Sequence, residues 1–329
     1  MKKYIKALLI GLAAISVISC EDVVEIDVTP GETQLVVDAF INNRFREQEI
    51  KLTYSKPYFS TSQALPATGA SVTVEDLLNE GKVITFTDTN ENGVYTWMPT
   101  SADDTLQIRL REDINDETSG GFYQEQYKLS ISMPNGEAYE AFTSIERVPT
   151  IDSIQVYKEE ESLFYPVETI VAELWAYDLK GKNDYYWVKT WKNGKFLNKV
   201  SEMNLVHDII PGTNNDENAD GVAFIPPVRT GINPNLDADE IDELPLYEVG
   251  DSIYVEIHSL TDGAFGFMSM AKEQMQNGGL FATPVVNLPT NIIAINEQSE
   301  GKAIGYFSGS AIKSYGIKIN EEPPYKDNN

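Results

Sequence analysis

Hydrophobic and polar residues alternate with a period of two along most of the chain. The clearest runs are Leu106, Ile108 and Leu110; Tyr127, Leu129, Ile131 and Met133; and Ile253, Val255 and Ile257. Such alternation is typical of antiparallel strands that bury one face. Asn135-Gly136 and Asn193-Gly194 stand between strand-like segments, and Asn-Gly favours a type I′ hairpin because both residues tolerate positive φ. The pattern predicts an all-β protein made of two sandwich-like antiparallel domains.

One segment follows a helical period instead. Phe267, Met268, Ala271 and Met275 recur at helical spacing, Thr261-Asp262 offers an N-cap, and Asn277-Gly278-Gly279 offers a stop. We expect one short helix near 263–276, in the second domain, with its apolar stripe packed in the core.

Domain boundaries follow from the same pattern. A new apolar alternation begins at Ile151, directly after Val148-Pro149-Thr150. We therefore expect a first β-sandwich over 34–148, a second β-rich domain over 149–319, and a disordered polar tail over 320–329.

The N-terminus has the form of a secretory signal. Lys2, Lys3 and Lys6 precede an apolar run over 7–18, which is too short to span a bilayer. Val17-Ile18-Ser19-Cys20 resembles the bacterial lipobox, which implies a signal peptide over 1–19, a lipid on Cys20 and a tether over 20–33. The alternative is a secreted protein in which Cys20 is a spare thiol. The position of the single cysteine at the end of the apolar run favours the anchor.

Composition excludes several classes of protein. The 329 residues include 51 Asp or Glu and 25 Lys or Arg, for a net charge of −26, which argues against a nucleic-acid partner. One cysteine excludes a disulfide framework, and two histidines leave little room for a histidine-ligated metal. Removal of 1–19 takes away three lysines and no acid, so the mature chain is more acidic still.

An acidic loop over 211–245 offers candidate ligands for a structural Ca²⁺. Hard cations prefer several oxygen ligands from alternate loop residues. The candidates are Asp216, Asn218, Asp220, Asp237, Asp239 and Asp242. Asp88 to Gly93 opens with a similar pattern, but Pro99 and Pro227 occupy the positions where an EF-hand has its bidentate Glu. A solvated acidic loop and, at 88–93, a hairpin turn are the alternatives, and we expect no other cofactor.

Aromatic residues crowd one segment of the second domain. The candidate ligand-binding residues are Trp175, Tyr177, Tyr185, Trp187 and Trp191. Aromatic faces can bind sugar rings or a partner's apolar patch, and the alternative is that one alternating set faces the sandwich interior. Equal parity places Tyr185, Trp187 and Trp191 on one strand face, and Trp175 and Tyr177 on one face of the preceding strand.

Catalytic signals are weak. His258 lies at the end of an alternating strand, where a hydrogen-bonded edge residue is the simplest interpretation. Nothing marks a carboxylate pair with split pKa values, so we expect no catalytic residues and no enzymatic activity.

Two resemblances concern larger parts of the chain. Gly69-Ala70-Ser71-Val72-Thr73-Val74, Gly81-Lys82 and Asp88 to Gly93-Val94-Tyr95 resemble the transthyretin-like or carboxypeptidase-regulatory-like β-sandwich. The mature chain resembles Bacteroidetes outer-membrane lipoproteins with domain of unknown function 4249. That resemblance is carried by Cys20, Leu35-Val36-Val37-Asp38, Pro149 to Ile154, Gly250-Asp251, Phe281 with Pro284, Thr290-Asn291-Ile292 and Gly305-Tyr306-Phe307-Ser308.

The second resemblance implies a location and a role. Such proteins are typically encoded beside TonB-dependent outer-membrane transporters, and Glu21-Asp22 after the cysteine resembles their signal for export to the cell surface. We therefore expect a surface-facing, lipid-anchored accessory of such a transporter in nutrient capture, with an oligosaccharide or a peptide as candidate ligand. The alternatives are a structural or adhesion module that binds another envelope protein and, less favoured, a glycoside hydrolase.

Overall fold

The computed structural model describes most of the chain after the N-terminal segment. The described residues are 32–57, 60, 62–79, 81–108, 126–161, 165–180, 184–207, 221–236, 244–276 and 287–326. The signal peptide, Cys20 and the tether up to residue 31 lie outside them. Residues Thr33–Asn329 form one compact unit, to which all contacts below belong.

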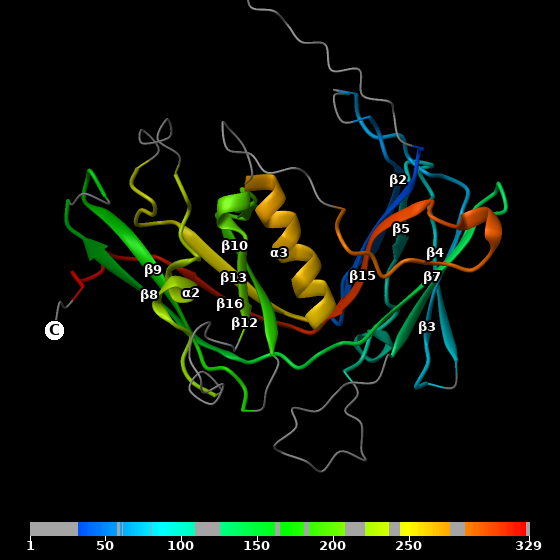
Figure 1. The fold of residues 1–329 in the computed structure, drawn as a ribbon. Helices are drawn as coiled ribbons and strands as arrows, with labels where there is room; N and C mark the ends of the chain where they lie inside the picture. The colour runs from blue at the N-terminus through cyan, green and yellow to red at the C-terminus, as the bar shows by residue number, and fades with distance from the viewer. Residues whose placement is uncertain are drawn as a thin grey trace, which may run out of the picture. The chain divides into compact units, whose positions relative to one another are not determined.

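Antiparallel β-sheets dominate the described residues, as the alternation predicts (Figure 1). The first sandwich-like region has a four-stranded sheet in the order β15-β1-β2-β5 and a five-stranded sheet in the order β14-β7-β6-β3-β4. Their bounds are β1 Leu35–Asn42, β2 Gln48–Tyr54, β3 Ser71–Asp76, β4 Lys82–Phe86, β5 Val94–Trp97, β6 Tyr127–Ser132, β7 Ala138–Thr143, β14 Ile293–Ala294 and β15 Ala303–Ser310, with a short 3-10 helix at Ala102–Asp104 and another at Glu297–Ser299.

The second region has a sheet in the order β11-β10-β13-β16, with β12 also paired to β10, and a separate β8-β9 pair. The strands are β8 Ile151–Glu159, β9 Thr169–Ala176, β10 Tyr185–Lys192, β11 Lys195–Phe196, β12 Asn204–His207, β13 Ser252–Leu260 and β16 Ile312–Lys318. The helices are α2 Pro226–Thr230 and α3 Asp262–Gln276, with a 3-10 helix at Val200–Glu202. Each region has its own buried apolar cluster.

The two hairpins predicted from Asn-Gly pairs are present, but only the second has the predicted type I′ turn, because Gly136 has φ 90° and Asn135 does not adopt positive φ. The Asn135-Gly136 turn joins β6 to β7, and Asn193-Gly194 joins β10 to β11. Asn193 has φ 52° and Gly194 has φ 78°, so both residues adopt the left-handed conformation that a type I′ turn requires. The side chains of Tyr127, Leu129, Ile131 and Met133 are all buried, as their alternation predicts.

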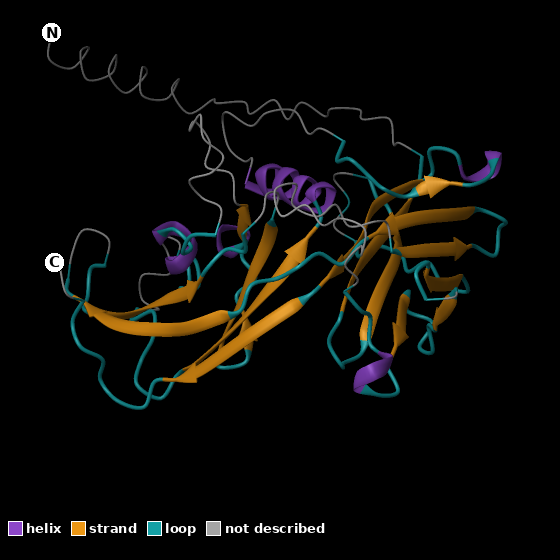
Figure 2. Cartoon of the chain, turned by 90° about the horizontal axis from the view of Figure 1, so that it is seen from below, coloured by secondary structure: helices purple, strands orange, loops and turns teal. Residues whose placement is uncertain are grey.

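The helix predicted near 263–276 is α3, Asp262–Gln276. The hydroxyl of Thr261 accepts a hydrogen bond from the backbone N–H of Ala264 at 3.2 Å, which is an N-cap interaction. Met268 is buried in a small cluster with Leu260 and Tyr306, whereas Met275 is exposed. The apolar stripe of α3 therefore packs in the core only along the first two turns of the helix. In Figure 2, α3 is the longest helix drawn and lies along one side of the strands.

The second half of the chain returns to the first region. Strand β15 pairs in parallel with β1 over their full lengths, and β14 pairs with β7. Gly305 permits the close approach, because a Cβ there would lie 2.0 Å from the carbonyl oxygen of Val37. Two strands from the predicted 149–319 domain therefore complete sheets of the predicted 34–148 domain.

Two predictions from local pattern are wrong. Residues 106–108 of the first alternating run are not in a strand, although Leu106 is buried; Leu110 lies outside the described residues. Residues 320–326 of the predicted disordered tail are held in place. The N–H of Lys158 donates to the carbonyl of Pro324 at 2.9 Å, and the Lys326 ammonium lies 2.6 Å from Glu173. Strands β8 and β9 supply partners that the tail's own composition does not reveal.

Candidate functional site

The outer face of β10 carries three of the aromatic residues predicted to bind a ligand. Tyr186 and Val188 are buried in the core, so the alternate residues Tyr185, Trp187 and Trp191 share the opposite face. Their shared face agrees with the parity of the sequence.

Strand β13 lies beside β10, and its side chains on the same face include polar and charged groups. Trp187 pairs in register with His258, Lys189 with Glu256, and Trp191 with Tyr254. The ring centroids of Trp191 and Tyr254 are 5.5 Å apart, and those of Trp187 and His258 are 6.1 Å apart. Aromatic and charged residues therefore alternate along this surface of the sheet.

A cavity of about 600 Å³ lies against this face. Its walls are the outer face of β10, the β1–β2 hairpin and α3, which lies between β13 and β15 in Figure 1. The volume is in the range of small-molecule sites. The lining residues are Asp38, Phe40, Ile41, Asn42, Arg46, Glu47, Gln48, Glu49, Lys51, Trp187, Lys189, Phe196, Met203, His258, Phe267, Met268, Ala271 and Ser310.

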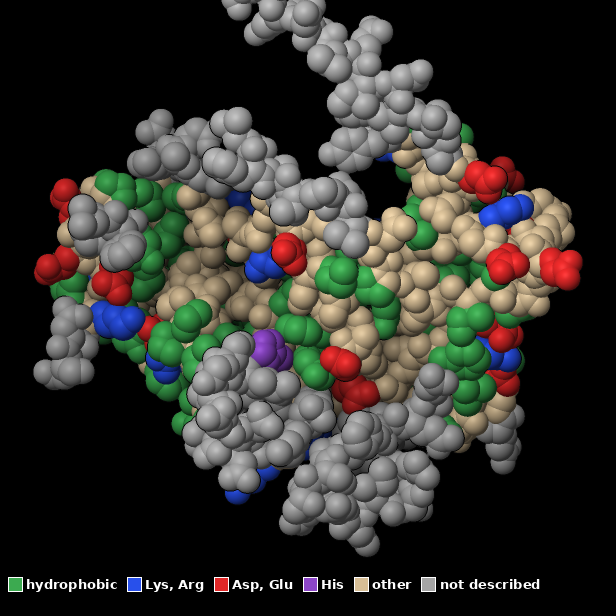
Figure 3. Space-filling view, in the orientation of Figure 1, with side chains coloured by type: hydrophobic (Ala, Val, Ile, Leu, Met, Phe, Trp, Pro, Cys, Tyr) green, Lys and Arg blue, Asp and Glu red, His purple; other side chains and the backbone are tan. Residues whose placement is uncertain are grey.

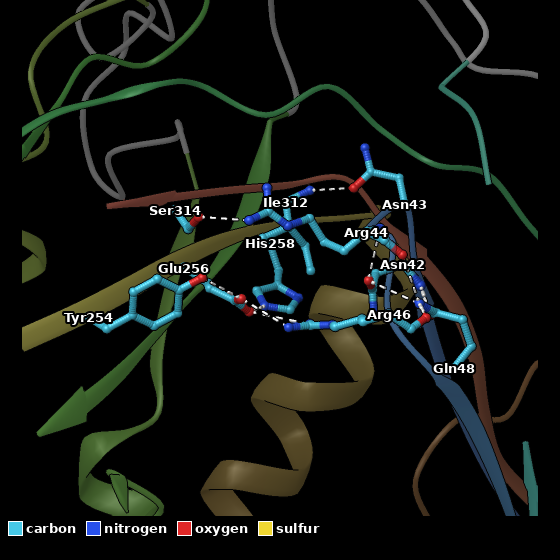
Figure 4. Close-up of polar contacts among 10 residues, drawn as sticks. All are labelled: Asn42, Asn43, Arg44, Arg46, Gln48, Tyr254, Glu256, His258, Ile312 and Ser314. Atoms are coloured by element: carbon cyan, nitrogen blue, oxygen red, sulfur yellow. Dashed lines mark hydrogen bonds and ion pairs between the residues drawn. The ribbon is translucent and has the colours of Figure 1, made fainter. Parts of the chain in front are cut away.

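Glu256 is the centre of a buried polar cluster beside the cavity (Figure 4). Its side chain is 2% exposed and accepts two hydrogen bonds from the guanidinium of Arg46, at 3.0 and 3.4 Å. The Nε2 of His258 lies 2.8 Å from the second carboxylate oxygen, and the Tyr254 hydroxyl donates to the first at 3.1 Å. Three side chains from two regions of the molecule thus converge on one carboxylate.

This arrangement fixes the charge of both buried groups. Burial alone would raise the pKa of Glu256, but hydrogen bonds from His258 and Arg46 and the positive charge of Arg46 outweigh it and lower the pKa to about 2. Burial lowers the pKa of His258 to about 4, assisted by the charges of Lys189 and Arg46 and opposed by its hydrogen bond to Glu256. At neutral pH, Glu256 is therefore ionised and His258 is neutral, with its Nε2–H donating to the carboxylate.

Lys189 is the other charged group on this wall. Its ammonium lies 3.7 Å from the centroid of the Trp187 ring, a cation–π distance. Burial lowers the pKa of Lys189 to about 8; Arg46 acts in the same direction, and Glu256 and Asp38 oppose it. A part of the Lys189 population is therefore uncharged at mildly alkaline pH.

The loop between β1 and β2 brings Arg46 to this sheet. Gln48 organises it from within: the side chain is buried, its Oε1 accepts from the N–H of Asn42 at 2.8 Å, and its Nε2 donates to the carbonyl of Arg46 at 3.0 Å. A buried carboxamide satisfied on both sides stabilises one loop conformation.

The same loop is bonded to β16 as well. The side-chain oxygen of Asn43 accepts from the N–H of Ile312 at 3.0 Å, and Arg44 donates to the hydroxyl of Ser314 at 3.0 Å (Figure 4). The hairpin of the first region is thereby fixed against the sheet of the second, and the cavity lies between them.

Trp175 and Tyr177 lie elsewhere, on β9 and just after it. The guanidinium of Arg229, from α2, lies 4.1 Å from the centroid of the Trp175 ring, and Tyr177 is 54% exposed. Neither lines the cavity. The structure therefore divides the five predicted aromatic residues into two groups, and of all five only Trp187 lines the cavity.

The candidate calcium ligands cannot be placed. Asp216, Asn218, Asp220, Asp237, Asp239 and Asp242 all lie outside the described residues. Among the residues that are described, no group of three or more His, Cys, Asp or Glu side chains could hold a metal ion. At 88–93, the Asp88 carboxylate accepts hydrogen bonds from the N–H groups of Asn92 and Gly93, which is a closed hairpin turn.

Acidic side chains are spread over the visible surface. Figure 3 shows Asp and Glu scattered across this face, several of them next to Lys or Arg. Lys158, for example, lies 3.0 Å from Glu168 and 2.9 Å from Glu322. The negative charge of the chain is therefore not gathered into one patch on this face.

The polar half of the site was not predicted from the sequence. His258 is hydrogen-bonded, as expected, but β13 is a central strand rather than an edge. Arg46, Lys189 and Glu256 received no prediction. One signal was available in the sequence: Glu256 and His258 alternate with the apolar residues Val255 and Ile257. This alternation predicts that one face of the strand is polar, but it does not show that other parts of the chain bury that face.

Within the described part of the chain, none of the helices has the length and apolar character needed to cross a membrane. No curated protein matches the sequence. Residues 21–315, by contrast, match the model of a domain of unknown function, DUF4249. The match covers nearly all of the sequence after the N-terminal segment, and the chain therefore belongs to the DUF4249 family.

Proposed function

We propose that this protein is a lipid-anchored, non-enzymatic binding protein on the outer face of an outer membrane, where it captures a nutrient for a TonB-dependent transporter. The ligand site is the cavity between the β1–β2 hairpin, β10 and α3. An oligosaccharide or peptide ligand was expected from the sequence, and the cavity admits a fragment of either.

The observation that carries the binding role is the make-up of this cavity. Apolar side chains from β1, β10 and α3, among them Phe40, Trp187 and Phe267, face the same space as the charged groups of Lys189 and Arg46. Small-molecule sites combine apolar and aromatic walls with polar groups in fixed positions, and this cavity has both kinds of lining residue. The charges are held in place before any ligand arrives, which lowers the cost of ordering on binding.

The cellular location rests on the N-terminal sequence. The apolar run that ends at Cys20 and the acidic Glu21-Asp22 that follow it support a lipid anchor and surface export. A multiply acylated cysteine gives stable membrane attachment, since each buried methylene contributes ~0.8 kcal/mol.

A hydrolase is the weaker proposal. A glycosidase needs a carboxylic acid whose pKa is raised, so that it can donate a proton. Burial raises the pKa of Asp38, which lines the cavity, but the pKa of Glu256 is lowered to about 2, and three donors already occupy the oxygens of Glu256. This carboxylate is suited to holding Arg46 in place and not to proton transfer.

Purification from membranes tests the location and the partner together. The full-length protein, extracted in mild detergent, is expected to carry a labelled acyl chain and to co-purify with a TonB-dependent transporter. Cys20→Ala should lose both the label and the membrane fraction. Recovery of the acylated protein alone, together with normal growth of a deletion strain on every nutrient tested, would contradict the transporter role.

A further inference from the structure

We propose that the cavity binds a ligand with one carboxylate group on an apolar body, and that the ammonium of Lys189 binds the carboxylate. This inference rests on the proposed binding role of the cavity and specifies its ligand class.

The first argument is the position of Lys189. It projects from the middle of β10 into the cavity wall, with its ammonium over the Trp187 ring. In the described part of the chain it makes no hydrogen bond or ion pair with another residue. A desolvated ammonium without an acceptor is unfavourable. A carboxylate in the cavity would supply the missing acceptor and would form a charge-assisted hydrogen bond.

The second argument is that the other cations of the cavity already have partners. Arg46 donates twice to Glu256, and Lys51 lies 3.6 Å from Glu49. Lys189 is therefore the one lining cation, among the described residues, that lacks a carboxylate partner.

The third argument limits the charge of the ligand. Asp38, Glu47 and Glu49 also line the cavity, and of these Glu49 is paired with Lys51. The other two carboxylates repel a dianion such as a phosphate monoester more strongly than a monoanion. One negative charge matches one available ammonium. A monocarboxylate fits this balance better than a phosphate does.

The apolar side chains of the lining favour an apolar body on the ligand. Phe40, Phe196, Met203, Phe267 and Met268 come from β1, β11, the segment before β12 and α3. Burial of apolar surface contributes about 25 cal/mol per Å², and methionine side chains adapt to different ligand shapes. The expected ligand thus has an aromatic or aliphatic body and an acidic end.

The charges around Lys189 give the binding a pH signature. Asp38 on β1, Glu256 on β13 and Arg46 on the hairpin all act on its ammonium, whose pKa burial lowers to about 8. A bound carboxylate favours the charged form and raises that pKa. Near pH 8.5, binding should therefore be accompanied by proton uptake.

Isothermal titration calorimetry with 4-phenylbutyrate and its neutral analogue 4-phenylbutyramide tests the inference on the full mature chain. The acid is expected to bind at least tenfold more tightly than the amide. At pH 8.5, titrations in buffers of different ionisation heat should show uptake of a fraction of a proton with the acid and none with the amide.

Variants separate a direct contact from a general charge effect. Lys189→Met should lower the affinity for the acid to that for the amide, leave the affinity for the amide unchanged and abolish the proton uptake. Lys189→Arg should restore the affinity for the acid. Lys313→Met is the matched control, because it removes the same charge from an exposed position outside the cavity, and it should bind the acid within about threefold of wild type.

Three results would overturn the inference: no binding of the acid by the wild type, equal binding of acid and amide, or equal losses of affinity for the acid in Lys189→Met and Lys313→Met. None of them bears on acylation or on co-purification with a transporter, so failure of the ligand class is distinguishable from failure of the proposed function.

Discussion

Both faces of β13 carry buried side chains, but they differ in the chemistry of those side chains. On the inner face, the side chains of Ile253, Val255 and Ile257 are completely buried among other apolar residues. On the outer face, Glu256 and His258 are almost as deeply buried, but each is hydrogen-bonded to a specific partner. The same strand thus contributes to an apolar core on one side, and on the other side it carries polar side chains that are hydrogen-bonded to defined partners.

The comparison separates stability from positioning. An apolar face stabilises the fold through burial and tolerates changes that keep its volume. A buried ion pair contributes little net stability, because desolvation offsets the attraction. What the Glu256 cluster does instead is hold Arg46, and with it the β1–β2 hairpin, at one place beside the cavity.

The largest expected effect belongs to the inner face. Ile257→Ala removes three buried carbons and leaves a cavity in the core, so the free energy of unfolding should fall by about 2–5 kcal/mol. Denaturant unfolding of the purified protein measures it. Because Ile257 points away from the ligand cavity, the affinity for 4-phenylbutyrate should stay within about twofold of wild type. A tenfold loss of affinity would show that the two faces are not independent.

The next effect concerns the outer face and depends on pH. The folded pKa of His258, about 4, lies below its ordinary value of 6.5. As pH falls from about 6.5 to 4, the unfolded chain takes up a proton that the folded chain does not. The free energy of unfolding should therefore decrease through this window, by about 3 kcal/mol at its lower end.

A control variant isolates this contribution. Burial raises the pKa of Glu146 to about 7, so that group stabilises the fold as pH falls between its two pKa values, opposite to His258. Glu146 contributes equally in the wild type and in His258→Gln, so its effect cancels in the difference between their free energies of unfolding. That difference should shrink as pH falls from 6.5 to 4, and a constant difference would contradict a neutral buried histidine.

Elements with a strong local signal could be predicted from the sequence. The alternation at Tyr127–Met133 and Ile253–Ile257 and the spacing in α3 each follow from the period of one element, and the two hairpins follow from the turn preference of their Asn-Gly pairs. Strand β15 could not be assigned to a sheet in this way. Its parallel pairing with β1 joins residues more than 260 positions apart, and nothing local marks such a partner.

The candidate site was predictable only in part, for the same reason. Parity placed Tyr185, Trp187 and Trp191 on one face, because strand geometry fixes that relation locally. Arg46 and Glu256 are 210 positions apart, and each looks like an ordinary surface charge in its own segment. Only the folded chain shows that Glu256 is covered and that Arg46 is its partner.

The smallest effect comes from the contact between hairpin and sheet. Arg46→Met leaves the buried Glu256 with His258 and Tyr254 but without its guanidinium, and should lower the free energy of unfolding by about 1–3 kcal/mol. Arg44→Met is the matched control in the same loop, because Arg44 bonds the neutral hydroxyl of Ser314; its cost should be smaller, about 0.5–1.5 kcal/mol.

A spectroscopic readout distinguishes the two arginines more sharply than stability does. The charge of Arg46 lowers the pKa of His258, so Arg46→Met should raise that pKa, whereas Arg44→Met should leave it within experimental error. The chain has only 2 histidines, so a nitrogen-15 NMR titration can follow both, with His258→Gln assigning the signals. Equal histidine titrations in the two arginine variants would mean that the outer face of β13 does not position the hairpin through Glu256. An upward shift confined to Arg46→Met would show that the guanidinium of Arg46, and with it the hairpin, lies beside the buried His258–Glu256 pair on the sheet that borders the cavity.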